Sequence, residues 1–357
     1  MKKLFISMLA VAAVVACSKE ETIIEQAPEA IAFDTFVNNA TRATDITTAN
    51  LSAFDVYASI VKADGTAGVI LDREDVTRSV SENGSYTWGY TNTQYWVPGN
   101  SYTFAAIAPA NHTSWSYAVT NGNVHNGVIS FNNYTAAANE DLIYAYQSRK
   151  LSNDKITSTP EKVAFTFNHE LSRVRFTFEN TIAAASNITL KIDSVRVTNA
   201  YRTGTLAVTV TDNVTTSGAT ADTWTVADNT YVIAFANDSA IIPGAGTKNA
   251  QGEVLSNSET TEHHYLIPAA TTYNVEFVVS VYQAGVLVGT YNRSASFSTE
   301  ATKGASYDVK AALTTNNILP EGEKFYPIEF TVTEVDAWDN FSNVNGTVNQ
   351  PAVGGNN

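Results

Sequence analysis

The sequence contains a single cysteine, Cys17, in a chain of 357 residues. One thiol cannot form a disulfide within the chain, so no disulfide framework stabilises this protein. The five histidines show no spacing typical of a zinc site, and the adjacent pair His263 and His264 would point to opposite faces of a strand. We therefore predict no metal site and no other cofactor.

Basic residues are also scarce, because 21 Lys and Arg are outnumbered by 35 Asp and Glu, which gives a formal charge of −14. A protein that binds nucleic acid needs basic patches to displace counterions from phosphates. The acidic balance therefore argues against nucleic acid as a partner. It also argues against electrostatic binding to a membrane surface.

Catalytic signatures are missing as well. No Gly-x-Ser-x-Gly elbow occurs, and the glycine-rich stretch 243–252 lacks the residue order of a phosphate-binding loop. The carboxylates are scattered, so a glycosidase pair has no support, although a hydrolase stays open as an alternative. We predict no catalytic residues and no enzyme.

The first 16 residues have the pattern of a secretory signal. Lys2 and Lys3 form its charged start, and the apolar run 4–16 ends in small residues. That run is shorter than the roughly 20 residues that span a bilayer. Residues 14–17, Val-Val-Ala-Cys, resemble the lipobox of bacterial lipoproteins, so Cys17 is the predicted lipidation site. A core cysteine after an ordinary cleaved signal is the alternative.

Short alternating apolar runs, broken by Asn, Gly, Asp and Ser, dominate the rest of the chain and predict strands. No window outside the signal has the 3.6-residue period of a helix. Residues 171–180 alternate apolar and polar side chains, as in a sheet with one buried face. Residues 272–298 predict two long strands joined at Ala284 and Gly285. The fold class is therefore all-β, with strands at the spacing of a β-sandwich.

The chain is long enough for two domains. A polar stretch at 147–161, with a proline near its end, predicts the boundary between them. We expect a signal peptide (1–16), a lipidated segment with the first strand (17–42), an N-terminal β-sandwich (43–158), a C-terminal β-sandwich (159–341) and a flexible tail (342–357).

Aromatic residues cluster in sequence around Trp88 and Trp96. Exposed rings of this kind stack on sugars, so both are candidates for glycan binding. The alternative, which is commoner in β-rich domains, is packing within the core.

Four further motifs resemble those of one family. Residues 163–180, VAFTFNHELSRVRFTFEN, resemble the Phe-x-His-x-Leu-Ser/Ala-x-Val-x-Phe signature that opens the C-terminal domain of fimbrillins, the subunits of type V pili in Bacteroidales. Residues 101–109, 141–150 and 327–340 are similar to the family's Tyr-x-Phe-x-Ala-x-x-Pro strand, its Asp-Leu-Leu-Tyr-Ala segment and its closing strand that ends in Trp. The motifs occur in the family's order and cover nearly the whole mature chain.

The resemblance implies two tandem transthyretin-like, Greek-key β-sandwiches, exported as a surface lipoprotein of the cell outer membrane. The acidic residues 18–21 are similar to the family's export tag. A trypsin-like Arg protease would then cut between Arg42 and Ala43, although Arg42 could also be an ordinary surface arginine. The cut frees the first strand, whose alternate residues would fill an acceptor groove: Ile31, Phe33, Thr35 and Val37.

Assembly by donor-strand exchange is a further implication, in which a neighbour's segment from within residues 325–348 refills the groove. The implied function is that of a fimbrial structural or tip subunit in cell adhesion. Its partners would be other fimbrillin subunits and host or bacterial surface glycans or proteins. A pilus anchor and a non-polymerising, glycan-binding lipoprotein are the alternatives. Ser194 and Ser239 match the family's O-glycosylation pattern.

Overall fold

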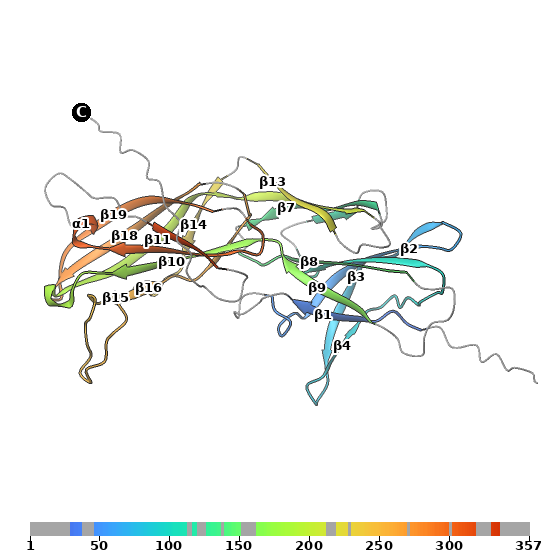
Figure 1. Ribbon diagram of the computed structural model, residues 1–357, viewed down its shortest axis with the longest axis horizontal. Helices are drawn as coiled ribbons and strands as arrows, with labels where there is room; N and C mark the ends of the chain where they lie inside the picture. The colour runs from blue at the N-terminus through green and yellow to red at the C-terminus, as the bar shows by residue number, and fades with distance from the viewer. Residues whose placement is uncertain are drawn as a thin grey trace, which may run out of the picture.

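The computed structural model describes residues 29–37, 46–112, 116–119, 126–136, 139–150, 162–211, 219–227, 230–269, 272–299, 302–318 and 330–335. Strands make up most of this part, in four sheets along an elongated molecule (Figure 1). The helical elements are short: a 3-10 turn at Ala184–Ser186 and α1 at Thr315–Ile318. The predicted all-β fold is confirmed.

Sheet I gathers the strands of the N-terminal half in the order β1-β9-β8-β5-β2-β3-β4. Its edge strands, β1 and β4, contact each other, so the sheet curls around a first core. That core includes Ile31, Phe33, Val37, Phe54, Val56, Trp88, Trp96, Phe104, Phe165 and Phe167. The strands are β1 Phe33–Val37, β2 Ala53–Val61, β3 Ala67–Val80, β4 Tyr86–Gly89, β5 Ser101–Ala108, β8 Ile143–Lys150 and β9 Val163–His169.

Sheet IV covers the other face of sheet I. Its order is β13-β12-β7-β6, with β6 Ser116–Val119, β7 Asn126–Thr135, β12 Thr203–Thr211 and β13 Ala219–Val226. Both faces of the central strands β2 and β5 carry buried residues, which is why a second layer can pack there. The middle core between the layers includes Tyr57, Ile107, Ile129, Phe131, Leu206, Val208 and Tyr265.

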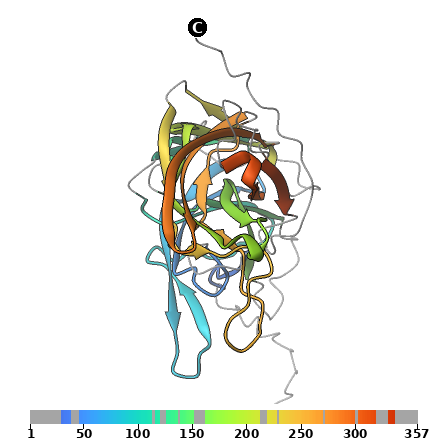
Figure 2. The same cartoon turned by 90° about the vertical axis from the view of Figure 1, so that its left-hand side faces the viewer.

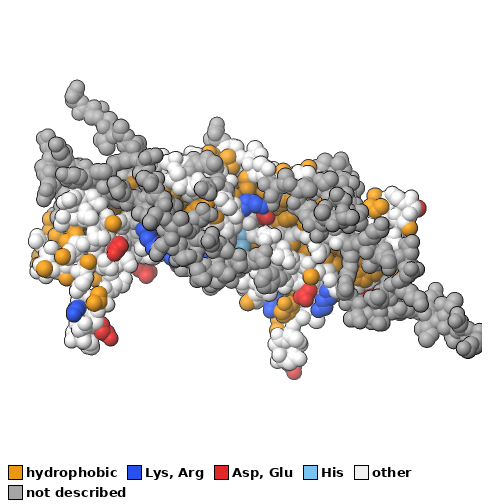
Figure 3. Space-filling view, viewed as in Figure 1, with side chains coloured by type: hydrophobic (Ala, Val, Ile, Leu, Met, Phe, Trp, Pro, Cys, Tyr) orange, Lys and Arg blue, Asp and Glu red, His pale blue; other side chains and the backbone are white. Residues whose placement is uncertain are grey.

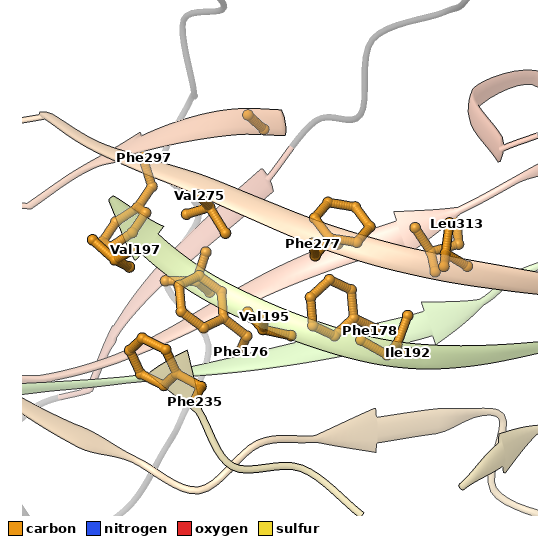
Figure 4. Close-up of a cluster of buried hydrophobic side chains, with 14 of the residues drawn as sticks. Phe176, Phe178, Ile192, Val195, Val197, Phe235, Val275, Phe277, Phe297 and Leu313 are labelled. Carbon is orange, nitrogen blue, oxygen red and sulfur yellow. The ribbon is translucent and has the colours of Figure 1, made fainter. Parts of the chain in front are cut away.

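Sheets II and III form a β-sandwich in the C-terminal half. Sheet II has the order β16-β10-β20-β21, with β17 also on β10, and sheet III has the order β14-β11-β18-β19, with β15 also on β11. Figure 4 shows the second core between them, where the Phe176 and Phe235 ring centroids lie 4.9 Å apart. The strands are β10 Ser172–Asn180, β16 Ser258–Thr260, β17 His264–Leu266, β20 Ser306–Leu313, β21 Phe330–Val335, β11 Ile188–Tyr201, β14 Thr230–Phe235, β15 Ile241–Ile242, β18 Thr272–Gln283 and β19 Val286–Ser298.

The long hairpin predicted over residues 272–298 is confirmed as β18 and β19. Its turn has positive φ at both central residues, 50° at Ala284 and 80° at Gly285. Such a turn matches the right-handed twist of the flanking strands. The two strands pair along most of their length, with one register shift between Val281 and Tyr282, close to the turn.

The expected division of the chain between residues 158 and 159 falls outside the described residues and stays a prediction. Hydrogen-bonded ladders cross that point, however. β9 pairs with β8 and β1 in sheet I, and β12 pairs with β7 in sheet IV. The two halves therefore share sheets, and the tandem transthyretin-like arrangement likewise stays a prediction.

Candidate functional site

The strand β1 lies at one edge of sheet I and runs parallel to β9 (Figure 1). Phe33 is paired with Val163 and Val37 with Phe167. In the described part of the chain, β9 is the sole ladder partner of β1. Apart from this ladder, Val37 N–H donates to Thr48 Oγ1 at 2.9 Å. A short edge strand has a ladder on one side only, which makes it the easiest strand of a sheet to detach.

The inward-facing residues of β1, together with Ile31 just before the strand, pack into the first core. The exposed fractions are 2% for Ile31 and Phe33, 7% for Thr35 and 3% for Val37. These are the four residues predicted to face the groove, and they alternate as the pleat of a strand requires. Each large apolar side chain buried in this way contributes about 1.5–3 kcal/mol.

Phe33 occupies the centre of this site. Its ring lies 5.6 Å from Phe165 in a stacked arrangement and 5.3 Å from Tyr90, measured between centroids. The rings of Phe54 and Phe104 complete the pocket at 6.2 Å each. Removal of β1 would therefore leave an aromatic pocket beside the unpaired backbone of β9.

The loop after β4 covers the start of β1. Ile31 N–H donates to the Gln94 carbonyl at 2.8 Å, and the Tyr90 hydroxyl donates to the Ile31 carbonyl at 2.9 Å. Glu74 holds this loop, because its carboxylate accepts the backbone N–H groups of Thr91 and Asn92 at 2.9 Å each. Burial alone would raise the pKa of Glu74, but the hydrogen bonds from Asn92 and Thr91 outweigh it and lower the pKa below its ordinary value of 4.5.

The replacement Glu74→Gln should lower the free energy of unfolding by about 1–2 kcal/mol at pH 7, because bonds to a charged acceptor are lost. Since the folded-state pKa is lowered, this stabilisation is present above pH 4.5 and is lost as the pH falls further. Denaturant titrations of both proteins between pH 7 and pH 3 measure the difference. A difference that stays constant over this range would show that the charge has no role.

Asp141 anchors the chain at Ile46, the first described residue after the segment 38–45 that follows β1. Its carboxylate accepts the N–H of Ile46 at 3.1 Å and lies 2.9 Å from Nδ1 of His169, at the end of β9. Both side chains are almost fully buried. Buried hydrogen bonds of this kind fix their partners firmly. The backbone at Ile46 is thereby tied to sheet I independently of β1.

Some of the predicted site residues lie within the described part of the chain and others lie outside it. Cys17, Arg42 and Ala43 lie outside the described residues. Ser194 is exposed on β11 and Ser239 is half-buried, so both stay predictions as glycosylation sites. Of the predicted donor segment 325–348, residues 330–335 are described and form β21, an edge strand of sheet II that pairs with β20.

Trp88 and Trp96 belong to the first core, with 9% and 4% exposed. Trp88 packs against Phe54 and Trp96 against Tyr102, each with ring centroids 4.8 Å apart. A ring enclosed in this way has no free face for a sugar. Both residues therefore follow the alternative, packing within the core. The prediction that Trp88 and Trp96 stack on glycans is corrected accordingly.

Sequence reasoning did not identify Tyr90, Glu74 or the pair Asp141 and His169 as parts of this site. Their roles depend on contacts between distant segments, such as the 95-residue separation between Ile46 and Asp141. Within the described ranges, no three His, Cys, Asp or Glu side chains gather as a metal site needs. No helix among the described residues is long and apolar enough to cross a membrane.

The model of a family described as fimbrillin-like matches residues 41–324. Among solved structures, a fimbrial protein from Bacteroides vulgatus is similar in fold, with a TM-score of 0.56 and 14% identity over 87% of this chain and 99% of that chain. Candidate cell adhesion proteins from Bacteroides uniformis and Bacteroides ovatus are each 18% identical. They cover 87% and 88% of this chain and 98% and 99% of their own, at TM-scores of 0.46 and 0.45. A search of curated proteins gave no match.

Proposed function

Because this chain belongs to the fimbrillin-like family, we propose that it is a structural or tip subunit of a fimbria, matured by proteolysis and assembled by donor-strand exchange. The family consists of fimbrial and cell-adhesion proteins rather than enzymes, and it implies other fimbrial subunits as partners and a location in fimbriae or at the cell surface. The observation that carries the finer proposal is the edge position of β1 over a buried aromatic pocket.

The position of Arg42 supports the maturation step. It follows β1, which ends at Val37, and precedes Ile46, which Asp141 holds. A cut after Arg42 separates these two attachments. A trypsin-like protease would thus free β1 without loosening the rest of sheet I.

Loss of β1 gives the subunit an acceptor groove. The edge of β9 then presents unpaired N–H and C=O groups beside the apolar pocket that Phe33 had filled. An extended segment with apolar residues at alternate positions restores both the ladder and the packing. The strand to be replaced is short, so the incoming segment needs only a few residues in register.

The donor lies within residues 325–348 of a neighbouring copy. This segment contains β21, which lies at the edge of sheet II and pairs only with β20 among the described strands. A groove in one half of the chain and a donor in the other generate a heterologous contact, which repeats along a filament instead of closing. A tip subunit would accept a strand without donating one.

Before the cut, acyl chains on Cys17 would hold the precursor in the outer membrane. Two or more chains bind a membrane stably, whereas a single chain binds it only reversibly. The variant Cys17→Ser should therefore lose membrane association and appear in the soluble fraction, which cell fractionation measures. A precursor that stays in the membrane fraction after this change would contradict lipidation at Cys17.

The N-terminus of the native protein provides the direct test of the proposal. Intact mass should show a chain that begins at Ala43 in filaments sheared from cells. Digestion with trypsin is unsuitable because trypsin itself cuts after Arg42. A chain that begins at acylated Cys17 and is confined to the membrane would contradict maturation and would favour an anchor.

A further inference from the structure

Charged residues are sparse at the end of the molecule opposite β1, where Arg293 donates to the carbonyls of Asn317 and Ile318 in α1. The segments 181–190, 239–247, 277–292 and 311–318 contain no Asp, Glu, Lys or Arg. Backbone hydrogen bonds join all four, since Ala284 N–H donates to Asn187, Ala184 N–H to Ala245 and Thr181 N–H to Leu313. Figure 2 faces this end, which bears α1 and the turn of the β18–β19 hairpin.

Three consecutive aliphatic residues at this end are exposed. Val286, Leu287 and Val288, which we call the end patch, are 70%, 52% and 53% exposed. In Figure 3, hydrophobic side chains are visible at this left-hand end of the described surface, and charged side chains are visible on the loop that projects below it. The end patch begins β19, which has β18 as its only ladder partner among the described strands. An apolar edge without charges is unprotected against pairing or docking.

A second apolar patch lies where β1 enters sheet I. Tyr95 and Val97, which we call the groove-mouth patch, are 47% and 50% exposed. Tyr95 forms a bridge with Ala30, and Trp96 N–H donates to the Glu29 carbonyl at 2.8 Å. Departure of β1 with residues 29–31 would remove both contacts and widen this patch.

We propose that the end patch of one copy docks on the groove-mouth patch of the next copy, as a second contact beside the exchanged strand. This inference rests on the proposed function. Both patches lie in charge-free stretches, since no charged residue occurs between Glu276 and Arg293 or between Glu82 and Glu140. Two copies of a chain with a formal charge of −14 repel each other, and they approach most easily through patches whose own residues carry no charge.

The arrangement along the molecule favours a second copy as the occupant. The β18–β19 turn and β1 lie in opposite halves of the elongated structure (Figure 1). Head-to-tail repetition therefore brings the end patch of one copy to the groove mouth of the next. Each patch is too small to hold a partner by itself, because stable interfaces bury about 1,200–2,000 Å². The contact would instead orient the neighbour while its donor strand enters the groove.

The replacement Leu287→Glu places a charge in the end patch. We expect about tenfold fewer filaments on cells, because the contact loses a buried aliphatic side chain. A second change, Val97→Lys, should restore filaments by pairing with the new carboxylate. The matched control is Val232→Glu, since Val232 is 52% exposed on β14, at the far edge of the same sheet. Equal filament yields from Leu287→Glu and Val232→Glu would overturn the proposal.

Cysteine cross-linking separates this contact from strand exchange. Cells expressing the double variant Leu287→Cys, Val97→Cys should yield a ladder of disulfide-linked subunits after mild oxidation. The pair Val232→Cys, Val97→Cys and the single variants are the controls for non-specific disulfides. Filaments without a ladder would overturn the end contact and leave strand exchange intact. Absence of filaments from cells that express the unaltered chain would overturn the proposed function and this contact with it.

Discussion

Replacement of Arg42 by alanine is expected to abolish filaments and to leave a membrane-bound monomer that begins at acylated Cys17. Without the cut, β1 stays covalently attached to the chain that it completes. A tethered strand has an effective concentration in the millimolar range, which a donor from another subunit cannot match. The groove therefore stays filled by Ile31, Phe33, Thr35 and Val37. Electron microscopy of cells and intact mass of the membrane fraction measure the outcome.

The matched control is Arg42→Lys, which keeps the positive charge and nearly the same size. An Arg-specific protease discriminates between the two because guanidinium and ammonium groups form different hydrogen bonds. We expect this variant to be processed slowly or not at all, although its surface is unchanged in charge. Normal filaments from Arg42→Ala would refute the maturation scheme, whatever the behaviour of the lysine variant.

Alternation of side chains was enough to predict the local parts of the candidate site. The resemblance indicated the strand, and the pleat of a strand places Ile31, Phe33, Thr35 and Val37 on one face, which is the buried face in the structure. The turn at Ala284 and Gly285 was equally readable, since a Gly at a central turn position is a local signal. Features that depend on neighbours in sequence were therefore accessible without a structure.

Long-range pairing was not accessible in the same way. Residues 163–180 look like one block in sequence, yet β9 belongs to sheet I and β10 to sheet II. The alternation in 171–180 assigned Arg173 to a polar face, but the residue is 1% exposed and its Nε donates to Ser306 Oγ at 2.6 Å. Which sheet covers a strand depends on residues more than a hundred positions away, and no local pattern encodes that choice.

The aromatic residues show the same limit. An exposed stacking ring and a core ring have identical sequence signals, because both appear as Trp among strand-forming residues. Only the curl of sheet I, which brings β1 and β4 together, decides that Trp88 and Trp96 are enclosed. β1 belongs to the same arrangement, because it contacts β4 and its inward residues join the core that holds both rings.

The replacement Phe33→Ala should destabilise the precursor by about 3–5 kcal/mol, because it leaves a cavity among the surrounding aromatic rings. Trp88 and Trp96 lie in the same core, so their fluorescence reports its unfolding in denaturant. Phe33→Leu, which fills most of the space, should cost less. The Phe33→Ala variant should nevertheless form normal filaments after processing, because residue 33 leaves the subunit together with β1.

Phe165→Ala tests whether residues of the groove behave differently from residues of β1. The Phe165 ring, on β9, stacks on Phe33 and stays in the subunit after the cut. We expect the replacement to destabilise the precursor by a similar amount, about 3–5 kcal/mol, and also to reduce filaments, since the donor strand would meet a damaged pocket. Residues that β1 carries away should thus affect only the precursor, whereas residues that line the groove should affect both forms. Filament loss from Phe33→Ala despite normal cleavage after Arg42 would show that β1 stays in the mature subunit, and the groove would then have no vacancy to fill.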